Sequence, residues 1–515
     1  MLARCSGAAL VGLEAVEVAV EVDIAPGLPG LQIVGLADAA VQESRERVRA
    51  ALRNSGLRPP LTRVVVSLAP ADLRKQGPAF DLPIALAVLA ASGQLNPVLL
   101  QGIWCAGELG LGGALRPVRG ALSLALAAKQ HGARALLLPD ANGPEAALVE
   151  GLAVWPAMHL EQALALLCSR PTVPPQMRDC GDGHPNPQAE TGPDLAEVQG
   201  QAHGRRALEI AAAGQHHLLL VGPPGSGKTL LARCLPRLLP PLQPAEQLEI
   251  TQLYSVAGLL PQAHGLIRQR PFRSPHHSCS APALAGGGST LRPGELSLAH
   301  RGVLFLDELA EFRRDVLNQL RQPLEQGELW LSRARQRLRF PCAITLVAAT
   351  NPCPCGWAGD PDHPCRCGTA QRLRYWGRLA GPLLDRIDLQ VVMQRPCASQ
   401  LRPGLERSRG TGESSAMVAE RVASARQRML RRNPDGLGNG QLSGHQLGQC
   451  GRISSAALEL WQQAVEQRGL SARAAERLLR VARTIADLEA SPEVEASALA
   501  EALSYRSFDQ LPQGL

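Results

Sequence analysis

Aromatic residues are scarce in this sequence of 515 residues: phenylalanine, tryptophan and tyrosine together make up 3%. This scarcity argues against a nucleic-acid site built mainly from rings that stack on bases. Long apolar runs are also missing, because the longest, residues 82–92 and 121–128, fall well short of the roughly 18 residues that a membrane span needs. The N-terminus lacks the charged segment and apolar helix of a secretory signal, so we expect no membrane contact and a cytoplasmic location.

The composition otherwise suits a folded protein of several domains. Hydrophobic residues make up 45% and charged residues 19%, and the chain is longer than the roughly 100–200 residues of a usual domain. The formal net charge of +7 favours a polyanionic partner contacted largely through phosphates, although a soluble protein can simply be basic. The 13 cysteines are an odd number, and in a reducing compartment thiols are free or bind metal more often than they pair.

The N-terminal region begins with strand-like patterns. Residues 16–24 alternate between an aliphatic face and an acidic face, which predicts a half-buried strand. A second strand is expected at residues 31–34, followed by a helix that Asp38 caps and that ends near Gly56. Another strand is expected at residues 62–68.

Later segments follow a different pattern. Residues 218–221, 303–306 and 344–347 are continuous apolar runs, typical of parallel strands covered by helices on both faces. Two segments rich in proline, glycine, serine or arginine lack any hydrophobic period and predict connections. The predicted domains are residues 1–168, a linker at 169–193, an α/β core at 194–395, a connector at 396–415 and a helical domain at 416–515.

A glycine-rich turn follows the first apolar run and precedes a helical stretch, which is the context that a P-loop requires. It consists of Gly222, Pro223, Pro224, Gly225, Ser226, Gly227, Lys228 and Thr229. Its glycines let backbone N–H groups close around phosphates, Lys228 neutralises the β- and γ-phosphates, and the Thr229 hydroxyl binds Mg²⁺. The sequence therefore predicts that these eight residues bind ATP.

Two carboxylates, Asp307 and Glu308, end the second apolar run. They are expected at the carboxyl edge of the sheet beside the P-loop, where ligands bind in open α/β folds. Asp307 is predicted to hold Mg²⁺ through water, and Glu308 to polarise the attacking water, a role that needs a carboxylate near the metal but not on it. Without the P-loop, the pair would indicate only a solvated strand end.

The motifs resemble those of AAA+ ATPases, and within them the magnesium-chelatase-like ComM/YifB family, over nearly the whole chain. The segments that carry the resemblance are Gly200-Gln201, Arg273-Ser274-Pro275-His276-His277, Gly286-Gly287-Gly288, Arg292 to His300, and Gly381-Pro382-Leu383-Leu384-Asp385-Arg386-Ile387-Asp388. The resemblance implies an α/β fold: an AAA+ P-loop core with a parallel sheet and a C-terminal helical lid.

The same resemblance implies roles for three polar residues. Asn351 is similar to the sensor that orients the attacking water, and Arg473 is similar to the second sensor arginine. Arg386 looks like the arginine finger that reaches the γ-phosphate of a neighbouring subunit, which implies a ring, a hexamer in this family. The alternative for Arg386 is an ion pair within its own chain, with Asp385 or Asp388.

The N-terminal region resembles the Lon protease domain, an α+β fold, over residues 68–167. Where Lon-type proteases carry their nucleophilic serine, this chain has Ala79, and the segment aligned with their catalytic lysine, residues 120–123, has no lysine. A Ser–Lys dyad needs both members, so we expect no proteolysis. The resemblance, which extends to the RadA recombination protein, implies a scaffold or DNA-contacting module.

Arginines occupy every second position in residues 330–339. They are Arg333, Arg335, Arg337 and Arg339. On a β-ribbon this spacing puts them on one face, where they can follow DNA phosphates, and related AAA+ motors use a hairpin at this place in the order to grip DNA. The alternative is a solvated basic edge that prevents strand pairing.

Four cysteines form two C-x-C pairs with nine residues between them: Cys353, Cys355, Cys365 and Cys367. Four thiolates at this spacing can close a tetrahedral Zn²⁺ site. The pairs are tighter than the usual two-residue spacer, and His363 can replace one ligand. Free thiols are the alternative, while the other histidines, including His276 and His277, are expected to be structural.

The resemblance implies an ATP-dependent DNA motor, a hexameric helicase that drives branch migration in homologous recombination or natural transformation. An alternative is a magnesium-chelatase-like ATPase that remodels a protein partner. The additional N-terminal domain favours the motor, since plain chelatase motor subunits lack it. A third possibility, an ATP-dependent protease, conflicts with the missing dyad.

Overall fold

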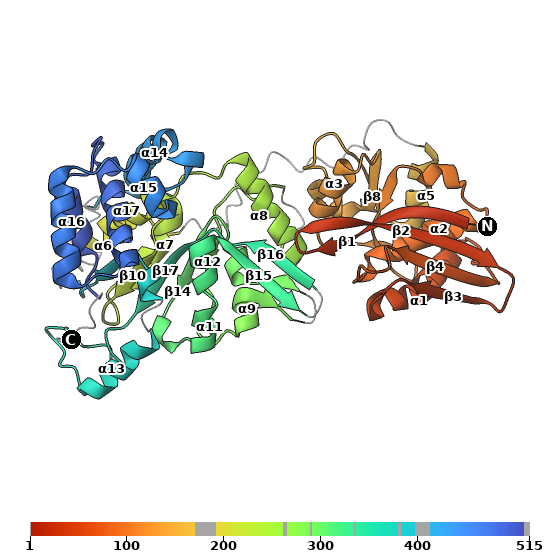
Figure 1. The fold of residues 1–515 in the computed structure, drawn as a ribbon. Coiled ribbons are helices and arrows are strands. Elements are labelled where there is room, and N and C mark those ends of the chain that lie inside the picture. Colours follow the sequence, from red (N-terminus) through yellow and green to blue (C-terminus); the bar gives the residue numbers. More distant parts are fainter. Residues whose placement is uncertain are drawn as a thin grey trace, which may run out of the picture. The chain divides into compact units, whose positions relative to one another are not determined.

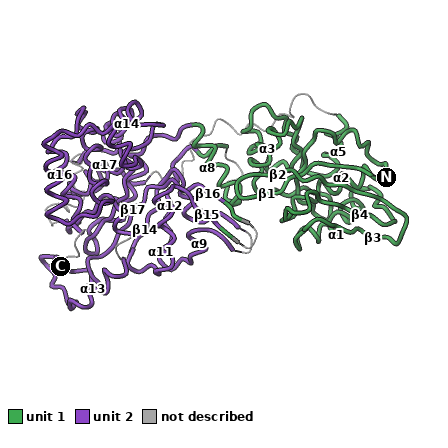
Figure 2. Tube along the Cα trace, viewed as in Figure 1, with its two compact units in different colours: residues 1–187, 244–267, 332–338 green, residues 188–243, 268–331, 339–515 purple. Residues whose placement is uncertain are grey.

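The computed structural model of the protein describes residues 2–169, 192–260, 265–288, 291–333, 336–379, 383–396 and 412–508. The chain forms two compact units (Figure 2). The first unit comprises residues 1–187, 244–267 and 332–338, and the second comprises residues 188–243, 268–331 and 339–515. The predicted linker and connector fall mostly outside the described residues.

A mixed sheet forms the centre of the first unit. Its strands are β1 (Leu2–Val11), β2 (Glu14–Ala25), β3 (Gly30–Val34), β4 (Arg63–Ala69), β5 (Ile103–Cys105), β8 (Ala135–Pro139) and β9 (Ala153–Ala157). They lie in the order β3-β4-β2-β1-β5-β8-β9, and Figure 1 labels β1 to β4 and β8. β2 pairs antiparallel with β1 and β4, whereas the other neighbours are parallel. The remaining elements are α1 (Ala39–Asn54), α2 (Asp81–Ala91), α3 (Ala121–Gln130), α4 (Gly143–Ala146), α5 (Leu160–Ser169), and the pair β6 (Glu108–Leu109) and β7 (Leu115–Arg116).

The first elements lie where the sequence predicts them. Val18, Val20 and Val22 are buried along β2, although Val16 near its start is exposed. Asp38 caps α1, because its Oδ1 accepts a hydrogen bond from the Val41 N–H at 2.9 Å. These predictions are confirmed.

One helix of the first unit comes from the middle of the chain. α8 (Pro244–Ala257) follows the P-loop helix in sequence but packs against α3. The Ser255 carbonyl accepts a hydrogen bond from the Gly120 N–H at 3.2 Å, and the Ser255 hydroxyl bonds to the buried carboxylate of Glu145. The Gln252 amide donates to the Leu13 carbonyl at 2.8 Å. The chain therefore enters the first unit a second time through this helix.

The second unit contains a parallel sheet. Its strands are β10 (Leu218–Val221), β11 (Phe272–Arg273), β14 (Val303–Leu306), β17 (Thr345–Thr350) and β18 (Leu389–Val392), in the order β11-β14-β17-β10-β18. All neighbouring strands are parallel, which confirms the prediction from the three apolar runs. Shorter pairs are β12 (Gly286–Gly287) with β13 (Arg292–Pro293), and β15 (Glu328–Arg333) with β16 (Gln336–Pro341).

Helices surround this sheet and fill the C-terminal part of the chain. They are α6 (Ala202–Gly214), α7 (Lys228–Leu238), α9 (Ala281–Ala285), α10 (Glu295–Leu298), α11 (Arg314–Asn318), α12 (Arg321–Gln326), α13 (Thr369–Arg378), α14 (Ser415–Arg432), α15 (Gly444–Cys450), α16 (Ser455–Arg468), α17 (Ala472–Leu488) and α18 (Ala496–Ser504). Among the described residues, each helix is too short or too polar to cross a bilayer.

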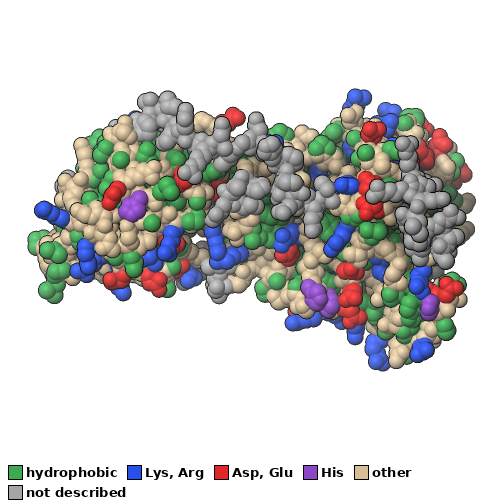
Figure 3. Space-filling model, turned by 180° about the vertical axis from the view of Figure 1, so that it is seen from behind, with side chains coloured by type: hydrophobic (Ala, Val, Ile, Leu, Met, Phe, Trp, Pro, Cys, Tyr) green, Lys and Arg blue, Asp and Glu red, His purple; other side chains and the backbone are tan. Residues whose placement is uncertain are grey.

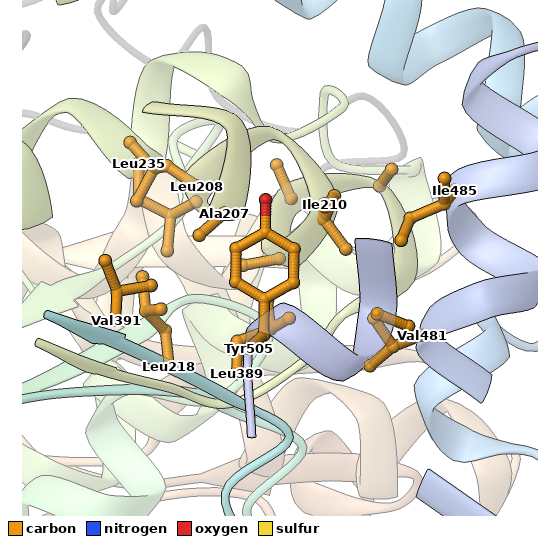
Figure 4. Close-up of a cluster of buried hydrophobic side chains, with 14 of the residues drawn as sticks. Ala207, Leu208, Ile210, Leu218, Leu235, Leu389, Val391, Val481, Ile485 and Tyr505 are labelled. Atoms are coloured by element: carbon orange, nitrogen blue, oxygen red, sulfur yellow. The ribbon is translucent and has the colours of Figure 1, made fainter. Parts of the chain in front are cut away.

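The C-terminal helices share one hydrophobic core with the sheet. Figure 4 shows the Tyr505 ring among side chains from α6, β10, β18 and α17, such as Leu208, Leu218, Leu389 and Val481. These side chains are buried, so the C-terminal helices pack onto the α/β part rather than forming a separate core.

Candidate functional site

Three loops meet at the carboxyl edge of the second sheet. β17 lies between β14 and β10, so the residues that follow these strands come together. The Gly222 N–H donates to the Thr350 carbonyl at 3.2 Å, which joins the turn after β10 to the end of β17. The glycine-rich turn, Asp307 and Asn351 therefore line one site.

The backbone of the turn explains its glycines. Gly225 and Gly227 have φ values of 76° and 85°, in the left-handed region that glycine adopts without strain. A Cβ atom on Gly222 would lie 2.5 Å from the Met393 carbonyl oxygen, so this position has no room for a side chain. α7 starts at Lys228, and the free N–H groups of its first turn face an anion placed in the turn. This geometry fits a nucleotide phosphate.

The Lys228 ammonium lies inside the turn. It donates to the carbonyls of Gly222 and Pro223 at 2.7 and 2.9 Å and to Asn351 Oδ1 at 3.3 Å. Burial lowers the pKa of the Lys228 ammonium, and the carboxylates of Asp307 and Glu308 act in the opposite direction. Lys228, which is predicted to bind phosphate, and Asn351, the predicted sensor, are therefore in direct contact.

Two oxygen ligands suited to Mg²⁺ also meet here. The Thr229 hydroxyl donates to Asp307 Oδ2 at 2.8 Å. A hydroxyl and a carboxylate are hard oxygen donors of the kind that Mg²⁺ selects, and both stand beside the phosphate turn. The residues present fit the predicted metal.

Glu308 has a partner that the sequence did not predict. Its carboxylate Oε2 lies 3.1 Å from His277 Nδ1, and more than half of its side chain is exposed. The backbone of Glu308 has a φ of 52°, an uncommon value for a residue with a side chain. His277 was expected to be structural, but the structure places it against the predicted catalytic carboxylate.

The two predicted arginines share one carboxylate. Arg386 Nη2 donates to Glu325 Oε1 at 2.6 Å, and Arg473 Nη1 lies 3.3 Å from the same oxygen. Arg386 is 7% exposed, whereas 64% of the Arg473 side chain is exposed. Arg386 does form an ion pair within its own chain, but with Glu325, since Asp388 instead contacts His216 and Arg477.

Gln201 is a second residue whose contacts at the site the sequence did not predict. Its side-chain amide donates to the carbonyls of Ser226 and Gln394, so it ties the P-loop to the chain after β18. Its backbone φ is 52°. The signal in the sequence was the Gly200-Gln201 pair ahead of the P-loop, which is one of the segments that carry the family resemblance.

The arginine-rich segment forms the predicted ribbon from β15 and β16. Arg337 and Arg339 are exposed while Phe340 is buried, and Arg339 pairs with Glu328. Arg335 lies outside the described residues, as does the Arg333 side chain. The expected alternation is present where the ribbon is described.

The four cysteines of the two C-x-C pairs come together. Their Sγ atoms all lie within 4.8 Å of one another. His363 instead stacks on Trp357, with ring centroids 4.4 Å apart, and its Nδ1 lies 3.3 Å from Asp360 Oδ1.

Ala79 of the first unit is held by backbone contacts. It lies in a short 3-10 turn before α2, and its carbonyl accepts a hydrogen bond from the Gly107 N–H at 2.9 Å. Two residues later, Asp81 is buried and binds Arg47 through both carboxylate oxygens, at 2.6 and 3.0 Å. This segment is occupied by structural contacts.

Comparison with known proteins gives matches along almost the entire chain. The family model described as magnesium chelatase, subunit ChlI, matches residues 194–401. Models described as subunit ChlI of Mg-chelatase and as the ChlI C-terminal part match residues 20–142 and 412–506.

Individual relatives match at full length or in part. The chain is 42% identical to competence protein ComM of Haemophilus influenzae, over 98% of both chains. It is 43% identical to the protein YifB of Escherichia coli, over 98% of this chain and 96% of that one. The magnesium-chelatase 38 kDa subunit of Rhodobacter capsulatus is 24% identical over 42% of this chain and 60% of its own length.

The P-loop geometry, the parallel sheet and these matches agree with one another. The chain belongs to the ComM/YifB family of magnesium-chelatase-like AAA+ ATPases.

Proposed function

We propose that this protein is an ATP-driven DNA motor that works as a hexameric ring and drives branch migration in homologous recombination or natural transformation. The observation that carries the ATP-driven part of the proposal is the contact of Lys228 with Asn351 and of Thr229 with Asp307 beside the glycine-rich turn. A full-length relative carries the name competence protein, and the arginine ribbon offers a surface suited to phosphates.

The residues of the site divide the work of hydrolysis. The P-loop N–H groups and Lys228 hold the phosphates, and Thr229 and Asp307 would hold Mg²⁺, which neutralises phosphate charge. Glu308 accepts the proton of the attacking water, and Asn351, which already contacts Lys228, orients that water. The P-loop sets the position of the phosphates, and the ends of β14 and β17 set the position of the water. Hydrolysis therefore depends on the register of the sheet.

The ring supplies the remaining positive charge. Arg386 acts on the nucleotide of a neighbouring subunit, and Arg473, at the start of α17, acts on its own. In this proposal the C-terminal helices α14 to α18 form the lid over the nucleotide. Glu325 holds both arginines within one chain, so each must exchange this carboxylate for a phosphate when it acts.

DNA is expected to be held mainly through its phosphates. On the face drawn in Figure 3, lysine and arginine side chains lie among acidic ones instead of in one continuous patch. The ribbon, with Arg337 and Arg339 exposed, offers arginine side chains for contact with the DNA backbone. Arg333 and Arg335 are proposed to extend the same face.

The N-terminal domain is proposed to be a Lon-like scaffold or DNA-contacting module without protease activity. The segment of Ala79 and Asp81 serves backbone and ion-pair contacts, which supports a structural role. Remodelling of a protein partner is the second candidate, and the magnesium-chelatase family models favour it.

Two substitutions test the ATPase site. Lys228→Ala should abolish ATP binding, because the ammonium lies inside the turn proposed to hold the phosphates. Glu308→Gln should retain ATP binding and lower kcat by roughly 10²–10⁴-fold. Binding is measured with a fluorescent nucleotide and hydrolysis by phosphate release.

Glu311→Gln is the matched control, since this exposed glutamate lies three residues beyond Glu308 and forms an ion pair with Arg378. It should hydrolyse ATP as the wild type does. Equal ATP affinity in Lys228→Ala and wild type would show that the phosphate site has been misplaced.

A further inference from the structure

The cysteine cluster has the dimensions of a metal site. Cys353 Sγ lies 3.3 Å from Cys355 Sγ and 3.6 Å from Cys365 Sγ, and the last two sulfurs are 3.6 Å apart. A tetrahedron with Zn–S bonds of about 2.3 Å has sulfurs roughly 3.8 Å apart. The observed spacing matches this arrangement, and Cys367 lies within 4.8 Å of the other three.

Backbone N–H groups point at these sulfurs. The Ala358 N–H donates to Cys353 Sγ at 3.3 Å, and the Cys367 N–H donates to Cys365 Sγ at 3.4 Å. Such donors stabilise negative charge on sulfur, as the surroundings of a metal-bound thiolate must. Cys353 is fully buried and the other three are half-buried, so the group is shielded from bulk solvent without being sealed.

The loop that carries the cysteines is joined to the ATP site. It begins two residues after Asn351, whose side chain contacts Lys228. The Trp376 indole N–H, on α13 beyond the loop, donates to the Pro352 carbonyl at 3.0 Å. A Cβ atom on Gly356 would lie 2.8 Å from Pro224 Cδ, so the loop approaches the P-loop closely.

We propose that Cys353, Cys355, Cys365 and Cys367 bind one structural Zn²⁺ as thiolates, and that this ion braces the turn that holds Asn351. Zn²⁺ suits four thiolates and keeps a closed tetrahedral site without redox chemistry. Residues 353–367 form no helix or strand between β17 and α13, so a metal ion would add links within an irregular segment. The bracing role deepens the proposed ATPase function, whereas zinc binding itself does not depend on it.

Zinc content is the first test. Protein purified under reducing conditions without added metal should contain one Zn²⁺ per chain by elemental analysis. Cys355→Ser and Cys365→Ser should lose it, while Cys450→Ser should keep it, since Cys450 lies on α15 outside the cluster and bonds to Gln446. Absence of zinc combined with failure to take up Zn²⁺ or Co²⁺ on titration would overturn the proposal, as would stoichiometric iron.

The absorption spectrum of bound Co²⁺ reports the coordination of the metal in the wild-type protein, without relying on a variant that must fold. Co²⁺ exchanged into the wild-type protein should show the intense visible absorption of tetrahedral thiolate coordination, and Zn²⁺ should bleach it. Weak octahedral-type absorption, or absorption unchanged in Cys355→Ser, would overturn the four-thiolate assignment.

The bracing role is tested separately. Cys355→Ser should still bind nucleotide, because its P-loop is intact, but should lose roughly 10–100-fold in kcat as Asn351 loses its fixed position. Cys450→Ser should match the wild type. Zinc loss with full ATPase activity would refute the bracing and leave the metal site standing. An inactive wild type that still holds zinc would instead count against the proposed ATPase function.

Discussion

At the scale of single residues, the surroundings of Arg386 bear directly on its proposed role as an arginine finger. An arginine finger must reach the nucleotide of another subunit, yet here Arg386 is nearly buried and bound to Glu325. A charge-assisted hydrogen bond of this kind is strong, but a γ-phosphate carries more charge than a carboxylate. In the proposed ring, a phosphate of the neighbouring subunit would therefore replace Glu325 as the partner of Arg386.

Arg386→Ala should bind ATP normally and lose roughly 10³-fold or more in kcat, because the finger stabilises charge only in the transition state. Mixing it with Glu308→Gln subunits should restore part of the hydrolysis if finger and carboxylate act in different chains. Arg378→Ala, at an exposed arginine of α13, is the control and should keep its activity. Full activity in Arg386→Ala would show that Arg386 is not the finger and that its role is the ion pair with Glu325.

A buried glutamate in the first unit predicts a pH effect. Burial raises the pKa of Glu145, and hydrogen bonds from Ser255, the Leu122 N–H and Asn142 only partly oppose this. The folded state therefore binds the proton more tightly than the unfolded state, so stability should fall as pH rises from the ordinary glutamate pKa toward the raised one. Glu145→Gln should flatten this dependence in thermal unfolding curves of the first unit. An unchanged slope in the variant would contradict it.

Much of the site could be predicted residue by residue. The P-loop glycines, Asp307 and Asn351 each follow an apolar strand, and parallel strands bring such positions to one edge. The partners His277 and Glu325 could not be predicted from their own surroundings, because they come from segments without a strong period. Side-chain pairing depends on tertiary geometry that local pattern does not carry.

At the scale of elements, the ribbon of β15 and β16 carries a test of DNA contact. Replacing Arg337 and Arg339 with alanine should reduce the slope of log affinity against log salt by about 0.9 per lost phosphate contact on duplex DNA. ATP binding should persist, since both residues lie outside the P-loop. Binding is measured by fluorescence anisotropy over a series of salt concentrations.

The control for the ribbon is Arg313→Ala, which removes an exposed arginine just before α11 that pairs with Asp315. It should leave the salt slope unchanged. Identical slopes in the ribbon variant and the wild type would favour the alternative, a solvated edge that prevents strand pairing.

The positions of helices and strands could be predicted better than the elements that pack against them. The strands at 218–221 and 303–306 and the helix after Asp38 form where periodicity indicates. The packing of α8 on α3 could not be foreseen, because a helical period shows which face is buried but not what covers it. The sequence order of α8, after the P-loop helix, favoured the other unit.

At the scale of the whole molecule, we propose that hydrolysis at the P-loop moves branched DNA. The direct measurement follows a fluorescently labelled four-way junction with ATP and Mg²⁺, using wild type, Lys228→Ala and Glu308→Gln. We expect strand exchange by the wild type alone, with ATPase activity stimulated by the junction and DNA binding weakened steeply by salt. A wild type that hydrolyses ATP equally with and without DNA and moves no junction would contradict the proposed DNA motor and favour remodelling of a protein partner.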